Sequence, residues 1–320
     1  MTLGEILDRT VTIYRARFLA LVGIALIPAL AMFSIHLADH ALLQVGHLFR
    51  PPTQRATYVW NFVVGLFFYH VSTLVSFPML PALTRVGSGQ IMGSPVTSWE
   101  AIRFAAARFG GYFWIALLKV LFQLILPEVA AVGVIAAAAF VADAIGAFND
   151  VAWSPAAWAI LILPALGAGI LFAWIGASLS LAFPVAVIEP VRGFRTLRRS
   201  WRLTRGSRGR VFAIWFTILA ISWILGFGLQ RCLWWIVVLL YWRFHLVLTA
   251  NGFYVPIALL MNAFLAGVVG PIYPVAATVI YYDQRVRHEG YDIELLMAAA
   301  GMDAAPASEK AEATAVQTDW

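Results

Sequence analysis

Four side chains that could bind a metal ion cluster near the end of the first apolar stretch. His36 and His40 are one helical turn apart, Asp39 lies between them, and His47 follows. A zinc site needs several such ligands in a suitable geometry, and no glutamate stands between the histidines as in a HExxH motif. Histidines at such a helix end are usually solvated. We therefore predict no metal site, no cofactor and no catalytic residue.

A second set of polar side chains lies inside apolar stretches, where an ionisable group is costly and a partner is expected. Lys119 and Gln123 share a helix face through their i, i+4 spacing, and Glu128 lies just after Pro127. His70 and Asn61 on the preceding stretch are candidate partners for Lys119 and Gln123. A polar contact between helices is the simpler interpretation, and an ion or substrate pathway is the alternative. Lys119 could also extend toward the interface.

A third set of residues carries much of the positive charge. It contains eight arginines with no acidic residue among them, and long apolar stretches flank it on both sides. Its members are Arg192, Arg195, Arg198, Arg199, Arg202, Arg205, Arg208 and Arg210. Cytoplasmic loops of membrane proteins carry an excess of Lys and Arg. The segment is therefore predicted to be a cytoplasmic loop.

The same segment is amphipathic on a helical wheel. Its apolar stripe consists of Phe194, Leu197, Trp201 and Thr204, and the arginines that project away from it are Arg192, Arg195, Arg199 and Arg202. Residues 1–17 show a similar stripe, made of Leu3, Ile6, Leu7, Thr10, Val11 and Tyr14. Such helices lie in the membrane interface, with the stripe toward the acyl chains. We expect anionic head groups to bind at Arg192, Arg195, Arg198, Arg199, Arg202, Arg205 and Trp201. Topology determination alone is the other interpretation.

Composition indicates what kind of scaffold must position these groups. Hydrophobic residues make up 62% of the 320 residues and charged residues only 12%, whereas soluble chains contain about 25% charged residues. A nucleic-acid reader needs a basic face on a soluble fold, and no stretch is polar enough to form one. The single Cys232 excludes a disulfide within the chain. The chain is predicted to be an integral membrane protein.

Six stretches have the roughly 20 apolar residues that a membrane helix requires. They are Phe18–Ala38, Tyr58–Leu83, Gly111–Val141, Ala156–Ile188, Val211–Leu240 and Phe253–Tyr282. A break at Pro127 would leave Ala130–Val141 as a separate half-helix. We predict an all-α polytopic protein, in which residues 1–17 form a cytoplasmic amphipathic helix, 18–296 the transmembrane domain and 297–320 a disordered tail. The distribution of Lys and Arg places both termini in the cytoplasm.

The chain contains an internal pattern that occurs three times. A short basic amphipathic segment leads into an outward helix, and the returning helix carries an aromatic residue followed by proline, at Phe77-Pro78, Phe183-Pro184 and Tyr273-Pro274. Proline removes a backbone donor and kinks a helix, which a membrane tolerates only if neighbours satisfy the freed carbonyls. We predict three hairpins around a shared interior, with the kinks meeting near the cytoplasmic half. The alternative is that proline is simply common in membrane helices.

Three ordered motifs carry a resemblance to a known family. They are Gly4-Glu5-Ile6-Leu7-Asp8-Arg9, the segment from Leu197 to Gly206, and the segment from Tyr281 to Leu296. Through these motifs the chain resembles the glycerophosphoryl diester phosphodiesterase membrane-domain family. The resemblance covers almost the whole chain, up to about Leu296. The resemblance implies a polytopic bacterial or archaeal protein of the cell membrane. In some members a soluble phosphodiesterase barrel follows this region; here the barrel is missing, so the name implies no activity.

Three classes of function are compatible with these features. The preferred one is a non-enzymatic membrane protein that binds anionic lipid or a membrane protein partner, and no nucleic acid. A continuous polar path from Lys119 through Glu128 would favour a transporter or lipid-moving protein, and an ion-binding cluster at His36 would favour an enzyme. We also expect the charged segment after Tyr282 to dock on the arginine-rich loop, with Asp283, Glu189 and Glu289 as counter-charges.

Overall fold

The computed structural model describes the chain except for residues 46–53, 145–154, 245–253, 292, 294–295 and 298–320. Across the described residues the chain is all-helical. His47 and almost all of the predicted disordered tail lie outside the described residues, so those two predictions stay predictions.

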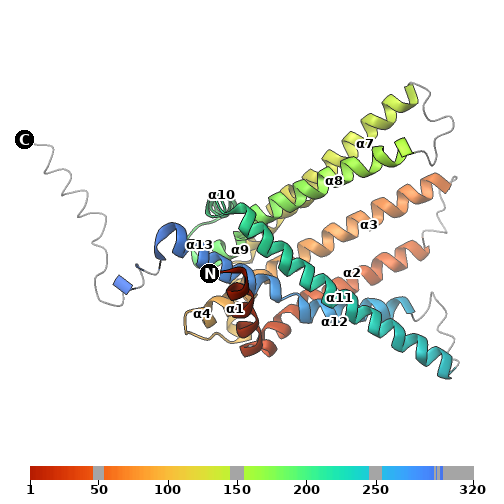
Figure 1. Cartoon of the computed structure of the whole chain (residues 1–320). Coiled ribbons are helices and arrows are strands. Elements are labelled where there is room, and N and C mark those ends of the chain that lie inside the picture. The colour runs from red at the N-terminus through yellow and green to blue at the C-terminus, as the bar shows by residue number, and fades with distance from the viewer. Residues whose placement is uncertain (46–53, 145–154, 245–253, 292, 294–295, 298–320) are drawn as a thin grey trace, which may run out of the picture.

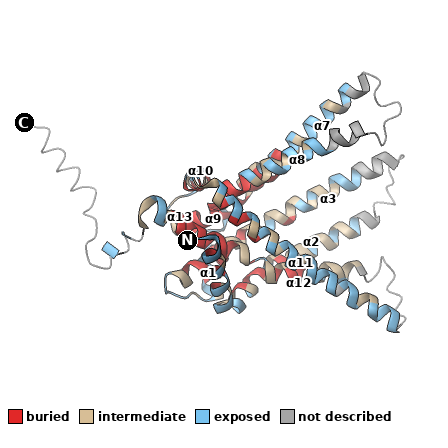
Figure 2. Cartoon of the chain, in the orientation of Figure 1, coloured by how far each residue is buried: buried red, intermediate tan, exposed pale blue. Residues whose placement is uncertain are grey.

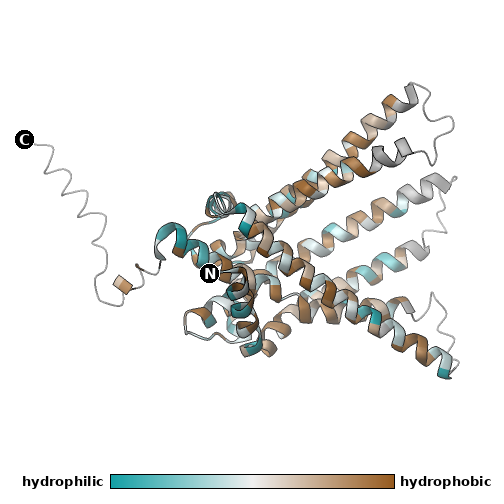
Figure 3. Cartoon of the chain, in the orientation of Figure 1, coloured by the Kyte–Doolittle hydropathy of each residue, from teal (hydrophilic) through white to brown (hydrophobic). Residues whose placement is uncertain are grey.

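Six helical segments are long and apolar enough to cross a membrane, in agreement with the six predicted stretches. They are Phe18–Leu42, Trp60–Ile91, Phe109–Ala138, Ile162–Ile188, Arg208–Arg243 and Val255–Glu289. The helices that build them are α2 (Phe18–Val45), α3 (Gln54–Ser76), α6 (Phe109–Lys119), α7 (Leu126–Ala144), α8 (Pro155–Ser178), α11 (Arg208–Phe244) and α12 (Tyr254–Val269). Apolar residues dominate their length (Figure 3).

The third segment does not break at Pro127. It passes from α6 through a π-helical stretch, η3 (Val120–Ile125), directly into α7. Of the two alternatives, the structure has one continuous segment and no separate half-helix at Ala130–Val141. A proline ring clashes with the carbonyl four residues earlier, which here belongs to Gln123. The wider π-helical turn separates these groups and lets the helix continue.

Consecutive long helices pack as pairs. α2 contacts α3, α7 contacts α8, and α11 contacts α12, while α2 also packs along α12. The pairs leave a common end of the molecule and diverge from it (Figure 1). This arrangement has the antiparallel neighbours that the three-hairpin pattern requires.

Each returning helix is interrupted at its aromatic–proline pair. α3 gives way to a short 3₁₀ turn, η2 (Phe77–Met79), and α4 (Leu80–Ile91), α8 gives way to α9 (Ala182–Ile188), and α12 gives way to α13 (Ile272–Glu289). Each proline lies in the first turn of the new element, where its missing N–H costs least. The predicted kinks are confirmed: at each one the regular α-helix is interrupted, while the chain continues as one membrane-length segment.

The three breaks meet, as predicted. α4, α9 and α13 contact one another, and the ring centroids of Phe77 and Phe183 are 6.0 Å apart. The hydroxyl of Tyr273 donates to the carbonyl of Ser180 at 3.5 Å. The three aromatic–proline pairs thus bring the returning helices into one interior.

The lead-in segments are helices α1 (Leu3–Ala16), α5 (Ser98–Ala107) and α10 (Phe194–Leu203). α1 and α5 start in the same way, with the capping boxes Thr2/Glu5 and Thr97/Glu100. They also end alike, because Arg17 (φ −125°, ψ 25°) and Arg108 (φ −124°, ψ 24°) turn the chain by the same geometry. α10 differs, since it follows Gly193 at φ 61° without a side-chain cap.

These lead-in helices pack against protein, which corrects their predicted lipid-facing stripes. On α1 the side chains of Ile6, Thr10 and Ile13 are buried, whereas Val11 is exposed. On α10 the buried face contains Leu197 together with Thr196, Ser200, Leu203 and Thr204. A helical wheel identifies an apolar face but does not say whether lipid or protein covers it.

We call the assembly of α1, α4, α5, α9, α10 and α13 the hub. Buried residues concentrate there, while the diverging helices are mostly exposed (Figure 2). α13 lies at its centre, with every residue from Pro274 to Gln284 buried. The hub supplies the rigid support for the charged groups described next.

Candidate functional site

One arginine of the arginine-rich segment connects the ends of two hub helices. Arg199 on α10 binds Glu189 through Nε at 2.9 Å and forms an ion pair with Glu289 through Nη1. Glu189 directly follows α9 and Glu289 ends α13. Carboxylates at helix C-termini are unfavourable because the helix dipole is negative there. The guanidinium of Arg199 offsets both of them.

Two further contacts complete this network. The hydroxyl of Tyr281 donates to Oε1 of Glu189 at 2.9 Å, and Arg285 pairs with Glu289 at 3.1 Å. Hydrogen bonding to Glu289, followed by that to Glu189, raises the pKa of Arg199 above its usual range, although burial opposes the shift. Arg199 is therefore a structural cation of the hub.

A second network surrounds Asp283, whose side chain is only 3% exposed. Its carboxylate pairs with Arg287 at 3.1 Å, with Arg210 at 3.3 Å and with the amino group of Met1 at 2.7 Å. A buried carboxylate requires such partners because desolvation of a lone charge is costly. Together the two networks confirm the predicted docking of the charged segment on the arginine-rich segment through Glu189, Asp283 and Glu289.

Five arginines of the segment remain free of such contacts. Their side chains are exposed, and among the described residues they have no hydrogen bond or ion pair. They are Arg192, Arg195, Arg198, Arg202 and Arg205. We call these five residues the arginine surface. It lies on and beside α10 at one side of the hub (Figure 1).

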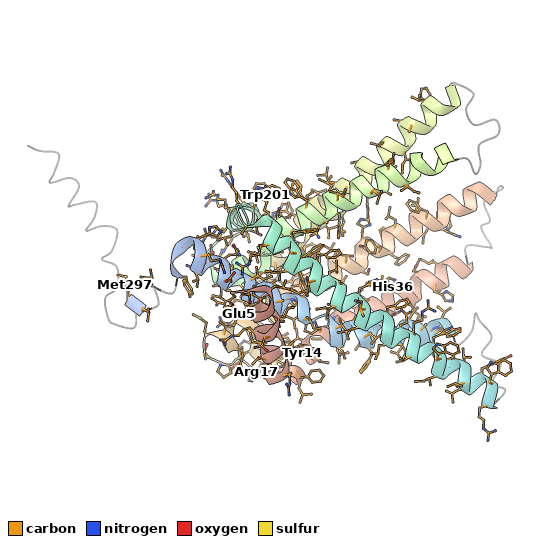
Figure 4. All side chains as sticks on the ribbon, viewed as in Figure 1. Glu5, Tyr14, Arg17, His36, Trp201 and Met297 are labelled. Carbon is orange, nitrogen blue, oxygen red and sulfur yellow. The ribbon has the colours of Figure 1, made fainter. Side chains whose placement is uncertain are left out.

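Trp201 lies on the same helix (Figure 4). Its ring packs edge-on against Trp174 of α8, with centroids 5.0 Å apart, and the guanidinium of Arg208 lies 4.7 Å from its centre. Cation–π contacts of this kind hold a guanidinium in place. Trp201 therefore joins α10 to the start of α11, and of the seven residues predicted to bind lipid, Trp201 and Arg199 have evident structural partners.

The polar side chains of the long helices form separate contacts. Lys119 is 3% exposed, so it does not extend to the interface, and its Nζ lies 5.5 Å from the ring centre of Phe77 and 5.6 Å from that of Phe183. His70 pairs with Glu128 at 3.0 Å and not with Lys119, which corrects the predicted partnership. Asn61 is exposed.

Gln123 is buried one turn beyond Lys119. A Cβ on Gly176 of α8 would lie 2.6 Å from its Nε2, so the glycine makes room for the amide. Within the described part of the chain, Oε1 of Gln123 has no hydrogen-bond partner. The amide thus packs between two helices. Among the described residues it makes no hydrogen bond with the His70–Glu128 pair.

The described members of the histidine cluster, His36, Asp39 and His40 on α2, do not assemble a metal site. The described residues contain no group of three or more His, Cys, Asp or Glu side chains that could hold an ion. His36 lies on α2, away from the hub (Figure 4).

Several hydrogen bonds of the hub could not be predicted from the sequence. The hydroxyl of Tyr14 on α1 donates to the carbonyl of Val268 at 2.6 Å, and that of Ser200 on α10 donates to the carbonyl of Ser178 at 2.9 Å. Both acceptors lie at the end of an interrupted helix, where carbonyls lack helical partners. Their partners are distant in sequence, so no local pattern could reveal them.

Comparison with known proteins gave no match to a family model, to a curated protein or to a solved structure.

Proposed function

We propose that this chain is a non-enzymatic integral membrane protein that binds anionic lipid through the arginine surface. The proposal places the protein in a prokaryotic inner membrane with the hub and both termini on the cytoplasmic side. The observation that carries the proposal is a contrast among the arginines on and around α10. Arg199, Arg208 and Arg210 have protein partners, whereas the five arginines of the arginine surface are exposed and have none among the described residues.

The energetic argument concerns the five unpaired guanidiniums. Each basic residue near an anionic leaflet contributes about 1 kcal/mol of attraction. Leu197 and Leu203 fix α10 to the hub, so the backbone that carries Arg195, Arg198 and Arg202 is already ordered before a head group binds. The five cations together are therefore enough for surface attraction of several kcal/mol.

The distribution of polar groups in the long helices favours binding over transport. A transporter or lipid-moving protein needs a continuous polar path between its helices, which is the alternative function. Lys119 instead contacts aromatic rings, and Glu128 pairs with His70. Separate contacts of this kind stabilise helix packing.

Family membership is part of the same proposal. We propose that the chain is a standalone member of the glycerophosphoryl diester phosphodiesterase membrane-domain family, built from three repeated hairpins. The capping boxes of α1 and α5 and their identical ends at Arg17 and Arg108 support a repeat. Superposition of the three hairpins after an experimental structure determination tests it.

The test of lipid binding compares two variants with the same loss of charge. Arg195, Arg198 and Arg202 are replaced by Gln in one, and the exposed Arg9, Arg15 and Arg103 in the other. Native mass spectrometry of the purified proteins then measures co-purifying anionic lipid. We expect the first variant alone to lose it. Equal lipid profiles for both variants and wild type would contradict the proposal and direct attention to a protein partner.

A further inference from the structure

A groove of about 820 Å³ lies between the start of α6 and the chain that enters α10. One wall is formed by residues 106–112 and Ile115, and the other by residues 186–193. The groove thus lies at the point where the second lead-in helix turns into its long helix. It adjoins the arginine surface through Arg192 but is otherwise made of different residues.

The charged groups of the groove favour an anion. Arg108 and Arg192 line it, and both side chains are exposed. Glu189 also lines it, but its carboxylate is bound by Arg199 and by the hydroxyl of Tyr281. The two arginines are therefore the charges left to act on a ligand.

The groove also contains a buried hydroxyl without an acceptor. Tyr112 lines it and is 3% exposed, and its hydroxyl donates to no acceptor among the described residues, although the guanidinium of Arg108 is close enough to donate to the hydroxyl oxygen. Arg108 and Arg85 are the charged groups near enough to act on this hydroxyl, and arginine can only donate hydrogen bonds. The hydroxyl proton therefore lacks an acceptor, a costly state for a buried group. A ligand oxygen in the groove would remove that cost.

The backbone beside Tyr112 is open to a ligand. A Cβ at Gly110 or Gly111 would meet no atom within 4 Å, and neither residue has a positive φ. Neither packing nor backbone conformation thus requires glycine at these two positions. In the first turn of α6 the amides of Gly111 and Tyr112 donate to the carbonyl of Arg108. The amides of Phe109 and Gly110 are therefore the ones available to a ligand, and amides at a helix N-terminus attract anions.

Exposed aromatic side chains surround the groove and indicate its level relative to a membrane. Phe109 is 48% exposed, Trp114 51% and Phe194 60%. Aromatic residues concentrate at the head-group level of membranes. The ligand with this chemistry is therefore a phosphate attached to a lipid, with its acyl chains along the apolar face of α6.

We propose that the groove is a specific site for the phosphate of an anionic phospholipid. The Tyr112 hydroxyl donates to a phosphate oxygen, Arg108 and Arg192 supply the positive charge, and the first amides of α6 complete the site. The inference rests on the proposed function in that the ligand is an anionic lipid. The inference adds a specific binding site, the groove, beside the arginine surface, which attracts head groups by its charge alone.

The test uses the full-length protein in detergent, with Tyr112→Phe as the variant. Binding is followed by the rise in unfolding temperature on addition of phosphatidylglycerol, with phosphatidylcholine and inorganic phosphate as separate additions. We expect Tyr112→Phe to unfold without lipid at or above the wild-type temperature, because it removes a buried hydroxyl whose proton has no acceptor. We expect its affinity for phosphatidylglycerol to fall about tenfold, the effect of one hydrogen bond to a charged group.

Tyr14→Phe is the matched control, because its hydroxyl has a partner in Val268. It should lower the unfolding temperature and leave lipid affinity unchanged. Gly110→Leu, whose added Cβ would meet no protein atom within 4 Å, places a side chain at the groove and should also weaken binding. Unchanged phosphatidylglycerol affinity in both Tyr112→Phe and Gly110→Leu would overturn the proposal. Equal protection by inorganic phosphate would overturn the assignment to a lipid.

The outcome is separable from that of the arginine surface. Loss of affinity in Tyr112→Phe with retention in the Arg195, Arg198 and Arg202 variant would support the groove and contradict the surface. The reverse pattern would support the surface and overturn the groove.

Discussion

The hub and the diverging helices of this protein are stabilised in different ways. In the hub, buried apolar side chains are combined with buried ion pairs and hydrogen bonds, such as those of Asp283 and Glu189. Along the diverging helices, large apolar side chains such as Leu19 and Phe140 are exposed. Among the described residues, the buried core thus concentrates at one end. The diverging helices expose an apolar surface of the kind that a membrane would cover.

The largest expected effect separates these two environments on one helix. Leu21 on α2 is 0% exposed and belongs to the buried cluster that it shares with the hub, and Leu19, two residues earlier, is 83% exposed. We expect Leu21→Ala to lower the free energy of unfolding by about 3 kcal/mol, as buried leucines do. Leu19→Ala should change it by less than about 0.5 kcal/mol. Denaturant unfolding in detergent micelles measures both, and similar losses would mean that the hub is no core.

The next effect concerns the ion-pair network. Glu189→Ala leaves Arg199 and Tyr281 without one partner each. We expect the free energy of unfolding to fall by about 2–3 kcal/mol, somewhat less than for a fully buried pair because Arg199 retains Glu289. Asp8→Ala, which removes an exposed acid of α1, is the control and should have little effect. If both variants had wild-type stability, the network would not hold the hub together.

A smaller effect of opposite sign is expected at the boundary between the two regions. Lys119 is buried against Phe77 and Phe183, and no carboxylate of the described residues pairs with it. Replacement by Met keeps the shape and removes a buried charge, so we expect Lys119→Met to raise the stability by about 1 kcal/mol. The same unfolding assay measures it. A clear loss of stability would show that the ammonium group is required where the hairpins meet.

The smallest effect is a pH dependence at the edge of the hub. Hydrogen bonding by Thr97, from its backbone N–H above all, lowers the pKa of Glu100 from its usual 4.5. A lowered pKa contributes stability that is present above pH 4.5 and is lost as the pH falls below it. Thr97→Ala and Glu100→Gln should both weaken the dependence of unfolding on pH below 4.5. An unchanged pH profile in Glu100→Gln would exclude this contribution.

The sequence predicted the parts of the fold that depend on local chemistry. Apolar length alone located the six candidate membrane helices, and the pairs at Phe77, Phe183 and Tyr273 located the breaks because proline acts on its own backbone. The docking of Glu189, Asp283 and Glu289 followed from charge, since long apolar stretches leave few alternatives for a carboxylate.

The remaining features depend on which surfaces meet in space. The stripe on α1 correctly indicated that Ile6 and Thr10 are buried, but attributed the burial to lipid. A helix face covered by lipid and one covered by protein contain the same types of residue, so the sequence does not distinguish them. His70 was a candidate partner of Lys119 and Gln123, whereas the structure places it beside Glu128, since helix rotation decides which side chains face each other. Tyr112 carried no signal, as a hydroxyl without an acceptor is recognisable only in three dimensions.

The central place of α13 has a consequence for biosynthesis. Among the described helices it comes last in chain order, yet it contacts α1, α4, α9, α10 and α11. The hub therefore has no complete core until α13 has been synthesised. We expect a chain interrupted before Ile272 to expose the surface that α13 would cover, and so to be more open to proteases and chaperones than a chain that contains it.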